Sequence, residues 1–280
     1  MMTNDIKEKY ETLKSMCEST LETVVPSGIP VKLASAMRYA LLGGGKRLRP
    51  VLYLAVLGSY GKAPSDADLK VAAAIECIHS YSLVHDDLPA MDGDLMRRGK
   101  PSVHAAYGEA EALLAGDALL NLSFSLLAEC ACYGGHYAHI MKLVADRCGA
   151  EGMIGGQALE FETDLRTADA ARLTEIAGLK TGMLMEAAAV SGCIAAGRED
   201  EADLWREYAH KLGIAFQLRD DILDRGSGEN SLAGVLGAGA EAELDGMIAD
   251  IDEILLRTGG NSEFLRALTS AMLRRTTDEV

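Results

Sequence analysis

Four aspartates fall between His85 and Asp94, directly after an apolar run that ends at Val84. They are Asp86, Asp87, Asp92 and Asp94. Carboxylates this close repel one another, so burying them together is costly unless a cation lies between them. Asp86 and Asp92 are about 240° apart around an ideal helix, so a regular helix could not direct both at one ion. Pro89 favours a helix break that lets the later aspartates fold back, and a solvated acidic helix end is the alternative.

A second acidic motif runs from Phe216 to Asp224. Its side chains with oxygen donors repeat at helical spacing, which places Gln217, Asp220, Asp221 and Asp224 on one helical face. Mg²⁺ prefers such oxygen donors, keeps several waters and takes further ligands from substrate phosphates. A single motif of this kind could be a solvated face. Two of them, each ending an apolar helix, favour a divalent-metal site.

Two basic segments could hold the phosphates that such a metal would bridge. The first is the glycine run Gly43–Gly45 followed by Lys46, Arg47 and Arg49. Glycines let backbone amides approach a phosphate, and the cations supply charge-assisted hydrogen bonds. The spacing of a Walker motif is absent. The second is Arg97-Arg98-Gly99-Lys100, which follows the first acidic motif and could alternatively serve only to neutralise it.

Two further polar residues stand out inside apolar helical segments. His79 precedes Asp86 by seven residues and so shares its helical face, although a lone histidine there is usually a satisfied core residue. Lys180, with Thr181 and Gly182, interrupts a long apolar segment. A lysine and a glycine weaken a helix there unless the lysine meets an anion or extends to solvent.

Composition limits the class of protein. The 280 residues carry a formal net charge of −15, which argues against a nucleic-acid surface or an anionic membrane surface. The six cysteines show no metal-ligand spacing and are expected to be buried thiols in a reducing compartment. The N-terminus is too charged for a signal peptide, and the apolar stretch 112–135 is interrupted by polar residues. We therefore expect a cytoplasmic protein without an integral membrane segment.

The apolar residues are mainly helix formers, and no linker or repeat divides the chain, so we predict one all-α domain over residues 1–280. The lengths of the helices suggest a bundle of long helices around a deep central cavity. The predicted helices cover 5–24, 30–42, 48–60, 66–88, 104–109, 111–133, 136–149, 152–160, 169–192, 199–224, 241–258 and 261–274.

Five motifs occur in the order typical of one family: GGGKRLRP, DDLPAMD with RRGKPSVH, GGQALEFE, LKTG and FQLRDDILD. Over roughly residues 30–224 the sequence resembles the trans-prenyltransferases, specifically bacterial farnesyl and geranylgeranyl diphosphate synthases. The resemblance implies the all-α isoprenoid synthase fold, a homodimer, and Mg²⁺ as the cofactor. It also implies condensation of isopentenyl diphosphate with an allylic diphosphate, dimethylallyl or geranyl.

Carried over to this sequence, the resemblance assigns roles to individual residues. Asp86, Asp92, Asp220 and Asp224 would bind the metal ions, and Asp86, Asp87, Asp92, Lys180, Asp220 and Asp221 would form the catalytic set. Isopentenyl diphosphate would be held by Lys46, Arg49, His79 and Arg98. The allylic partner would be held by Arg97, Lys180, Thr181 and Gln217.

Product length should depend on pocket depth. Tyr81 and Ser82 precede Asp86 by about one to one and a half helical turns, roughly 6–7.5 Å deeper along the helix. A tyrosine there should stop the growing chain early, as in family members that make the C15 product, farnesyl diphosphate. Family members with a smaller residue at this position tend to make C20, so geranylgeranyl diphosphate is the alternative.

The sequence departs from the family in two places. Residues 226–240 lack the lysines that usually close over the diphosphate, so we predict a more open site and weaker retention of the allylic substrate. Glu160 replaces an aspartate found in many relatives. A class I terpene cyclase is disfavoured because it needs no second diphosphate site, and a noncatalytic synthase subunit is disfavoured because both aspartate motifs are intact.

Overall fold

A computed structural model describes residues 3–224 and 231–275. By contacts the chain divides into two compact units, described separately below. Unit 1 comprises residues 1–9, 55–63 and 142–280, and unit 2 comprises residues 10–54 and 64–141. Three of the four boundaries between the units fall within α1 (Asn4–Val24), α3 (Leu48–Ser59) and α7 (Gly135–Cys148), and the fourth lies between residues 63 and 64, before α4. The predictions of a single domain and a central cavity stay predictions.

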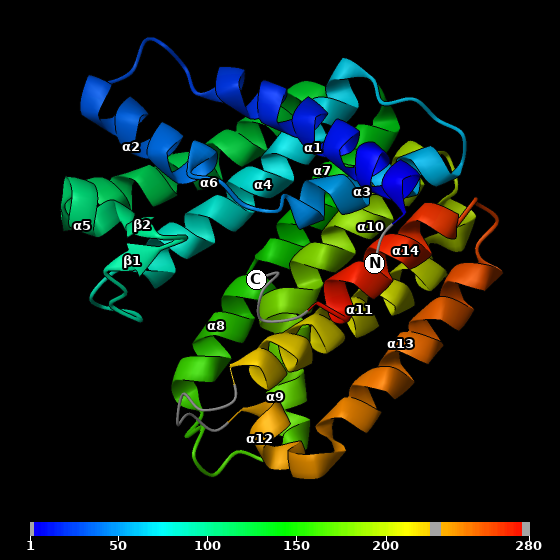
Figure 1. Cartoon of the computed structure of the whole chain (residues 1–280). Helices are drawn as coiled ribbons and strands as arrows, with labels where there is room; N and C mark the ends of the chain where they lie inside the picture. The colour runs from blue at the N-terminus through cyan, green and yellow to red at the C-terminus, as the bar shows by residue number, and fades with distance from the viewer. Residues whose placement is uncertain (1–2, 225–230, 276–280) are drawn as a thin grey trace. The chain divides into compact units, whose positions relative to one another are not determined.

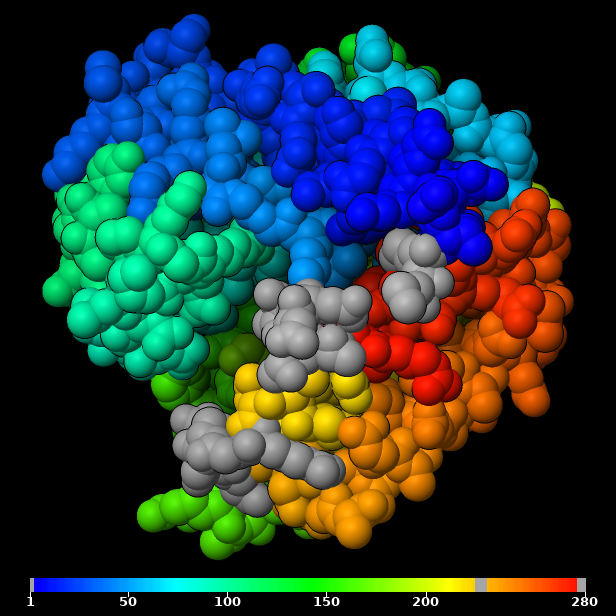
Figure 2. Space-filling view, viewed as in Figure 1, coloured from blue at the N-terminus to red at the C-terminus, as the bar shows by residue number. Residues whose placement is uncertain are grey.

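Unit 2 is built around a mostly buried helix, α4, which packs along α6 (Figure 1). Its elements are α2 (Val31–Leu42), α4 (Asp66–Asp86), β1 (Met96–Arg97), β2 (Lys100–Pro101), α5 (Val103–Tyr107) and α6 (Glu109–Ala131). A capping box starts α4, because Ser65 Oγ accepts from the amide of Asp68 and Asp68 accepts from the amide of Ser65. The strands form a short antiparallel hairpin, exposed on the face seen in Figure 2.

Unit 1 places α10 and α13 against α11 (Figure 1). Its elements are α8 (Met153–Glu162), α9 (Ala170–Ala177), a π-helical turn η1 (Gly178–Gly182), α10 (Met183–Ala195), a 3₁₀ turn (Glu199–Glu201), α11 (Ala202–Leu223), α12 (Leu232–Leu236), a second 3₁₀ turn (Gly237–Gly239), α13 (Ala240–Arg257) and α14 (Glu263–Leu273). The outer face of α13 is exposed (orange in Figures 1 and 2).

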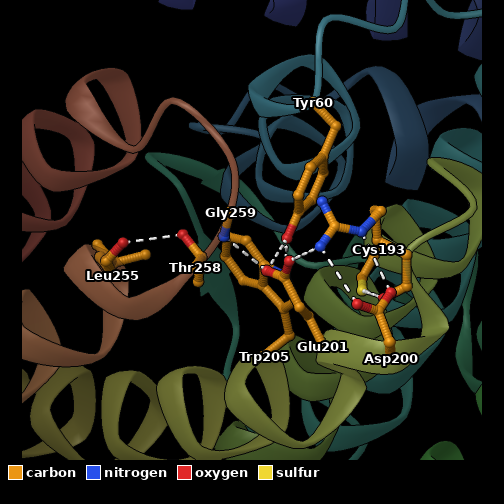
Figure 3. Close-up of polar contacts among 9 residues, drawn as sticks. Tyr60, Cys193, Asp200, Glu201, Trp205, Leu255, Thr258 and Gly259 are labelled. Carbon is orange, nitrogen blue, oxygen red and sulfur yellow. Dashed lines mark hydrogen bonds and ion pairs between the residues drawn. The ribbon is translucent and has the colours of Figure 1, made fainter.

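A buried polar cluster joins three segments of unit 1 that are distant in sequence (Figure 3). The Glu201 carboxylate accepts hydrogen bonds from Tyr60 Oη at 2.6 Å and from the amide of Gly259 at 2.8 Å, and it pairs with Arg198. Trp205 Nε1 donates to Tyr60 Oη at 2.8 Å. Because Glu201 is only 8% exposed, these partners supply the hydrogen bonds that water would otherwise make.

The all-α prediction is confirmed, and each predicted helical segment contains a helix. The segment predicted as one helix over 169–192 is divided into α9, η1 and α10. Helix α12 and the hairpin were not predicted from sequence. Of the described helices, α6 alone is long and apolar enough to cross a membrane, by length and composition only, and 44% of its most apolar window is buried.

Candidate active site

The first acidic motif lies where α4 ends in unit 2. Helix α4 stops at Asp86, two residues earlier than predicted, and tight turns follow around Pro89. The amide of Asp92 donates to the carbonyl of Asp86 at 2.9 Å. The predicted break is therefore present, and the backbone brings Asp86 and Asp92 together as one pair. Asp92 is exposed and Asp86 is half-buried, so water and ions can reach both.

The residue before Asp86 is anchored on α6. The His85 ring packs against Gly116, where an added Cβ would lie 2.0 Å from His85 Nε2. The same nitrogen lies 3.1 Å from the carbonyl oxygen of Leu113. Tyr81, which is 5% exposed, packs edge-on against the His85 ring at 5.8 Å between centroids. This packing fixes the end of α4 and so the place from which Asp86 extends.

Asp87 differs from its neighbours because it is turned into the protein. Its side chain is 3% exposed and accepts from Arg97 Nε at 2.9 Å. Arg97 also contacts Asp94 at 3.2 Å. Burial opposes the charge of Arg97, but the hydrogen bond and the charge of Asp87 outweigh it, so the pKa of Arg97 is raised. The hairpin is thus tied to the first acidic motif through an ion pair between the half-buried Arg97 and the buried Asp87.

The glycine-rich segment lies in unit 2 next to Arg98. Gly44 and Gly45 have φ values of +95° and +129°, which other residues rarely adopt. Gly45 also allows a close approach, because an added Cβ would lie 2.7 Å from Arg98 Nη1. Arg98 donates to the carbonyl of Gly44, and Lys46 is exposed. The structure therefore gathers Lys46 and Arg98 around one segment.

Arg49 and His79 lie together in the same unit. Arg49 Nη1 is 3.4 Å from His79 Nε2. Burial lowers the pKa of His79 well below its ordinary value, and the nearby charges of Arg49 and Arg98 lower it further. A neutral imidazole beside a guanidinium can accept a hydrogen bond from it. The four residues assigned to isopentenyl diphosphate thus belong to one unit.

The second acidic motif lines a cavity of about 240 Å³ in unit 1. Contributing side chains include Glu160, Lys180, Thr181, Gln217, Asp221 and Asp224. Gln217 Nε2 donates to Asp221 Oδ1 at 3.0 Å, and Thr181 Oγ1 is 3.4 Å from Gln217 Oε1. The structure therefore brings together the three residues assigned to the allylic partner in this unit.

Asp221 has a second contact that the motif did not reveal. Its Oδ2 accepts from the amide of Leu232 at 2.9 Å, at the start of α12. Ser231 caps the same helix by accepting from the amide of Gly234 at 3.2 Å. Both oxygens of Asp221 are thus engaged by protein donors, one by Gln217 and one by the helix start.

Asp220 pairs with an arginine that sequence reasoning missed. Arg275 donates to Asp220 Oδ1 and to the carbonyl of Met272, and its guanidinium stacks on Phe216 at 4.3 Å. Burial raises the pKa of Asp220, while the charge of Arg275 opposes this rise. No spacing in the sequence relates position 275 to position 220. Only the fold places α14 beside the end of α11.

The LKTG motif forms the π-helical turn η1. The backbone therefore departs from a regular α-helix at Lys180, and π-turns of this kind are frequent at functional sites. Lys180 Nζ pairs with Glu160 Oε2 at 2.5 Å. Gly156 on α8 and Gly213 on α11 allow close packing, because added Cβ atoms would lie 2.4 Å from Lys180 N and 2.3 Å from Gly182 Cα.

The donors in both motifs fit a hard divalent cation. Each motif offers carboxylate oxygens, and neither contains a thiolate or imidazole directed at them. Within residues 3–224 and 231–275, no group of three or more His, Cys, Asp or Glu side chains is arranged to hold a metal on its own.

Comparison with known proteins identifies the family. The polyprenyl synthetase family profile matches residues 30–238. The chain belongs to this family, and it is a prenyltransferase.

Individual relatives agree with this assignment. The chain is 39% identical over 242 residues to a farnesyl diphosphate synthase of Bacillus subtilis (strain 168), covering 85% of this chain and 81% of the relative. It is 39% identical over 228 residues to a geranylgeranyl diphosphate synthase of Cyanophora paradoxa, covering 80% and 76%. The apo crystal structure of an FPP/GFPP synthase from Zymomonas mobilis superposes with a TM-score of 0.88 at 33% identity, covering 97% of this chain and 100% of that one.

Proposed function

We propose that this protein condenses isopentenyl diphosphate with dimethylallyl or geranyl diphosphate to give farnesyl diphosphate, with Mg²⁺ as the cofactor. The main support is the pairing of two chemically different diphosphate subsites with two oxygen-donor motifs. Unit 2 offers Lys46, Arg49 and Arg98 with a neutral His79, and unit 1 offers a cavity lined by Lys180, Gln217 and carboxylates. The names of the relatives agree with this assignment.

The isopentenyl diphosphate subsite would consist of Lys46, Arg49, His79 and Arg98. A substrate that keeps its diphosphate through the reaction needs neutralisation by fixed cations, and its C–O bond must not be activated. The neutral His79 would accept from Arg49 and hold it in place. Guanidinium groups can bind phosphate oxygens in a bidentate fashion, which fixes the orientation of the bound molecule.

The allylic subsite would consist of Lys180, Thr181 and Gln217, with Arg97 contributed by the hairpin. Asp86, Asp92, Asp220 and Asp224 would hold the Mg²⁺ ions, which would draw charge onto the departing diphosphate. Binding would require Asp220 to exchange Arg275 for the metal. Asp87 and Asp221 would support the site by holding Arg97 and the start of α12.

The chain's own residues would contribute position and charge, with no covalent step on a side chain. Lys180 and Arg97 would stabilise the diphosphate as the allylic C–O bond breaks. Arg49 and Lys46 would hold isopentenyl diphosphate by its diphosphate group. Its double bond would then attack the allylic carbon. The released diphosphate would take the final proton.

Product length would be set by Tyr81 and Ser82. Tyr81 is 5% exposed and held edge-on against His85, so it would resist displacement by a growing chain. Ser82 Oγ donates to the carbonyl of His79 at 2.9 Å, which keeps this side chain close to the helix. Geranylgeranyl diphosphate is the alternative product, supported by relatives of that name.

We also propose a cytoplasmic homodimer. Leu113 and Leu114 on α6 are 49% and 56% exposed, which is unusual for leucines on so apolar a helix. A second copy of the chain would bury them. Light scattering or sedimentation should give twice the mass of the chain, and a monomer would contradict this part of the proposal.

Residues 226–240, which follow the second acidic motif, contain no lysine, and this bears on how tightly the allylic substrate is held. Residues 226–230 of the lysine-free segment lie outside the described residues, and residues 231–240 form α12 and a 3₁₀ turn. We propose weaker retention of the allylic substrate than in relatives with lysines there. Introducing a lysine into this segment should lower its KM, and unchanged KM and kcat would contradict the idea.

The decisive experiment is incubation with isopentenyl diphosphate, each allylic primer and Mg²⁺, followed by chromatography of the dephosphorylated alcohols. A C15 alcohol is expected, together with loss of activity in EDTA. A C20 alcohol would support the alternative product. A cyclic hydrocarbon formed from one substrate would indicate a terpene cyclase, and no turnover would indicate a noncatalytic subunit.

A further inference from the structure

Arg47 lies between two candidate diphosphate ligands but points the opposite way. Lys46 is exposed and Arg49 is half-buried, whereas the side chain of Arg47 is 1% exposed. Its Nη1 donates to Glu76 Oε1 and its Nη2 donates to the carbonyl of Leu41, both at 2.7 Å. The guanidinium therefore cannot serve as a substrate ligand, although its neighbours in sequence can.

The partner of Arg47 is equally buried. Glu76 on α4 has a side chain that is 1% exposed, and it precedes His79 by one helical turn. Glu18 Oε1 lies 3.5 Å from Arg47 Nε and adds a second negative charge. A buried ion pair with further hydrogen bonds has a defined geometry, and removing one partner leaves a buried charge uncompensated. This pair thus fixes the segment before α3 against α4.

The backbone at Arg47 adopts a conformation that its own side chain must stabilise. Its φ is +51°, in the left-handed region that residues other than glycine rarely adopt. Its carbonyl accepts the first hydrogen bond of α3, from Val51 at 3.0 Å. The preceding residue is held as well, since Tyr10 Oη donates to the carbonyl of Lys46. Strain of this kind persists only where surrounding contacts over-determine it.

The direction of Lys46 and Arg49 follows from this turn. Lys46 is exposed and Arg47 is buried, so these two adjacent side chains leave the turn in opposite directions. Were Arg47 to relax to an ordinary φ, both neighbours would rotate relative to His79 and Arg98. The chain has glycine at 44 and 45 but arginine at 47, where the side chain makes the buried contacts with Glu76 and the carbonyl of Leu41.

We propose that Arg47 is a positioning residue: its buried contact with Glu76 sets the left-handed turn that directs Lys46 and Arg49 at the diphosphate of isopentenyl diphosphate. The proposal rests on the function proposed above. It predicts a selective loss of affinity for isopentenyl diphosphate, because the allylic subsite uses other residues.

The test compares two variants with the unmodified protein by steady-state kinetics for each substrate. Arg47→Met/Glu76→Met removes both charges and keeps similar volume, so the fold should survive where Arg47→Met alone could fail. For the double variant we expect the KM for isopentenyl diphosphate to rise roughly tenfold to a hundredfold, with the allylic KM changed by no more than about twofold. For Arg47→Lys we expect a KM for isopentenyl diphosphate between those of the unmodified protein and the double variant. One ammonium group cannot reach both Glu76 Oε1 and the carbonyl of Leu41.

A matched control uses an ion pair of similar chemistry elsewhere. Arg147 Nε and Glu186 Oε1 are 2.7 Å apart in unit 1, and Glu186 is buried. Arg147→Met/Glu186→Met should leave the KM for isopentenyl diphosphate unchanged. Melting temperatures and circular dichroism of all variants separate misfolding from repositioning, and calorimetric titration with isopentenyl diphosphate measures binding without turnover.

Two outcomes overturn the proposal. One is a folded double variant with unchanged KM for isopentenyl diphosphate, and the other is an equal loss of affinity for both substrates. Failure of the proposed function is distinguishable from both, because the unmodified protein would then turn over neither substrate.

Discussion

Gly213 on α11 is predicted to be the point where added volume does most harm to the allylic subsite. An alanine there would place its Cβ 2.3 Å from Gly182 Cα and 2.8 Å from Gly182 N. Both neighbours are backbone atoms of η1, so they cannot move aside as a flexible side chain would. Gly213→Ala should therefore push the turn that carries Lys180 and Thr181.

The magnitude follows from two opposing effects. Alanine in a helix interior is favoured over glycine by about 1 kcal/mol, whereas overpacking costs about 1–3 kcal/mol. Because the contact is with backbone, we expect the upper end of that cost and a net loss of roughly 2 kcal/mol in the free energy of unfolding. Gly246→Ala on α13 is the matched control, since its added Cβ meets nothing within 4 Å. It should gain about 0.5–1 kcal/mol.

Urea denaturation followed by circular dichroism measures both variants. The difference between them should be about 2.5–3 kcal/mol, or roughly 5–12 °C in melting temperature. The KM for the allylic substrate should rise in Gly213→Ala and stay constant in Gly246→Ala. Equal stability of the two variants would refute the close packing of α11 on η1, and lost stability with an unchanged allylic KM would refute the link between the turn and the subsite.

Three other predictions address single side chains. Tyr81→Ala should lengthen the product from C15 toward C20, measured by chromatography of the alcohols; an unchanged C15 product would show that Tyr81 is only a packing residue. Arg275→Met should lower the melting temperature in EDTA, because Asp220 loses its buried cation, and added Mg²⁺ should recover part of the loss; no Mg²⁺ dependence would count against Asp220 as a ligand. Because the pKa of His79 is lowered in the folded state, the unfolded chain binds a proton at a pH where the folded chain does not. The contribution of neutral His79 to stability is therefore present above about pH 6.5 and is lost as the pH falls below it. Urea denaturation at pH 7.5 and pH 5 should show a smaller acid loss for His79→Asn than for the unmodified protein, and equal losses would contradict the shift.

Features with a local cause could be predicted from the sequence. Helical spacing placed Gln217 and Asp221 on one face, and they are hydrogen-bonded at 3.0 Å. Pro89 predicted the break after α4, and the Asp86–Asp92 backbone hydrogen bond follows from it. Lys180 was identified as anomalous because a lysine is unfavourable in an apolar segment, and it pairs with Glu160.

Features that depend on tertiary packing could not be predicted. Arg275 reaches Asp220 only because α14 lies beside the end of α11, and no periodicity joins the two positions. The contact of Asp221 with the start of α12 required knowledge of a five-residue helix too short to give a periodic signal. The π-turn at Lys180 packs against glycines on other helices, and sequence spacing does not reveal this packing. Whether the two acidic motifs share metal ions stays a prediction.

The hydrogen bond from the amide of Asp92 to the carbonyl of Asp86 joins main-chain atoms only. Substitutions at the intervening residues leave those atoms in place, provided that the proline keeps the helix from continuing. Deleting or inserting one residue there would shift the amide out of reach. This hydrogen bond therefore constrains the length of the loop, whereas Asp87 within it is constrained separately by its ion pair with Arg97.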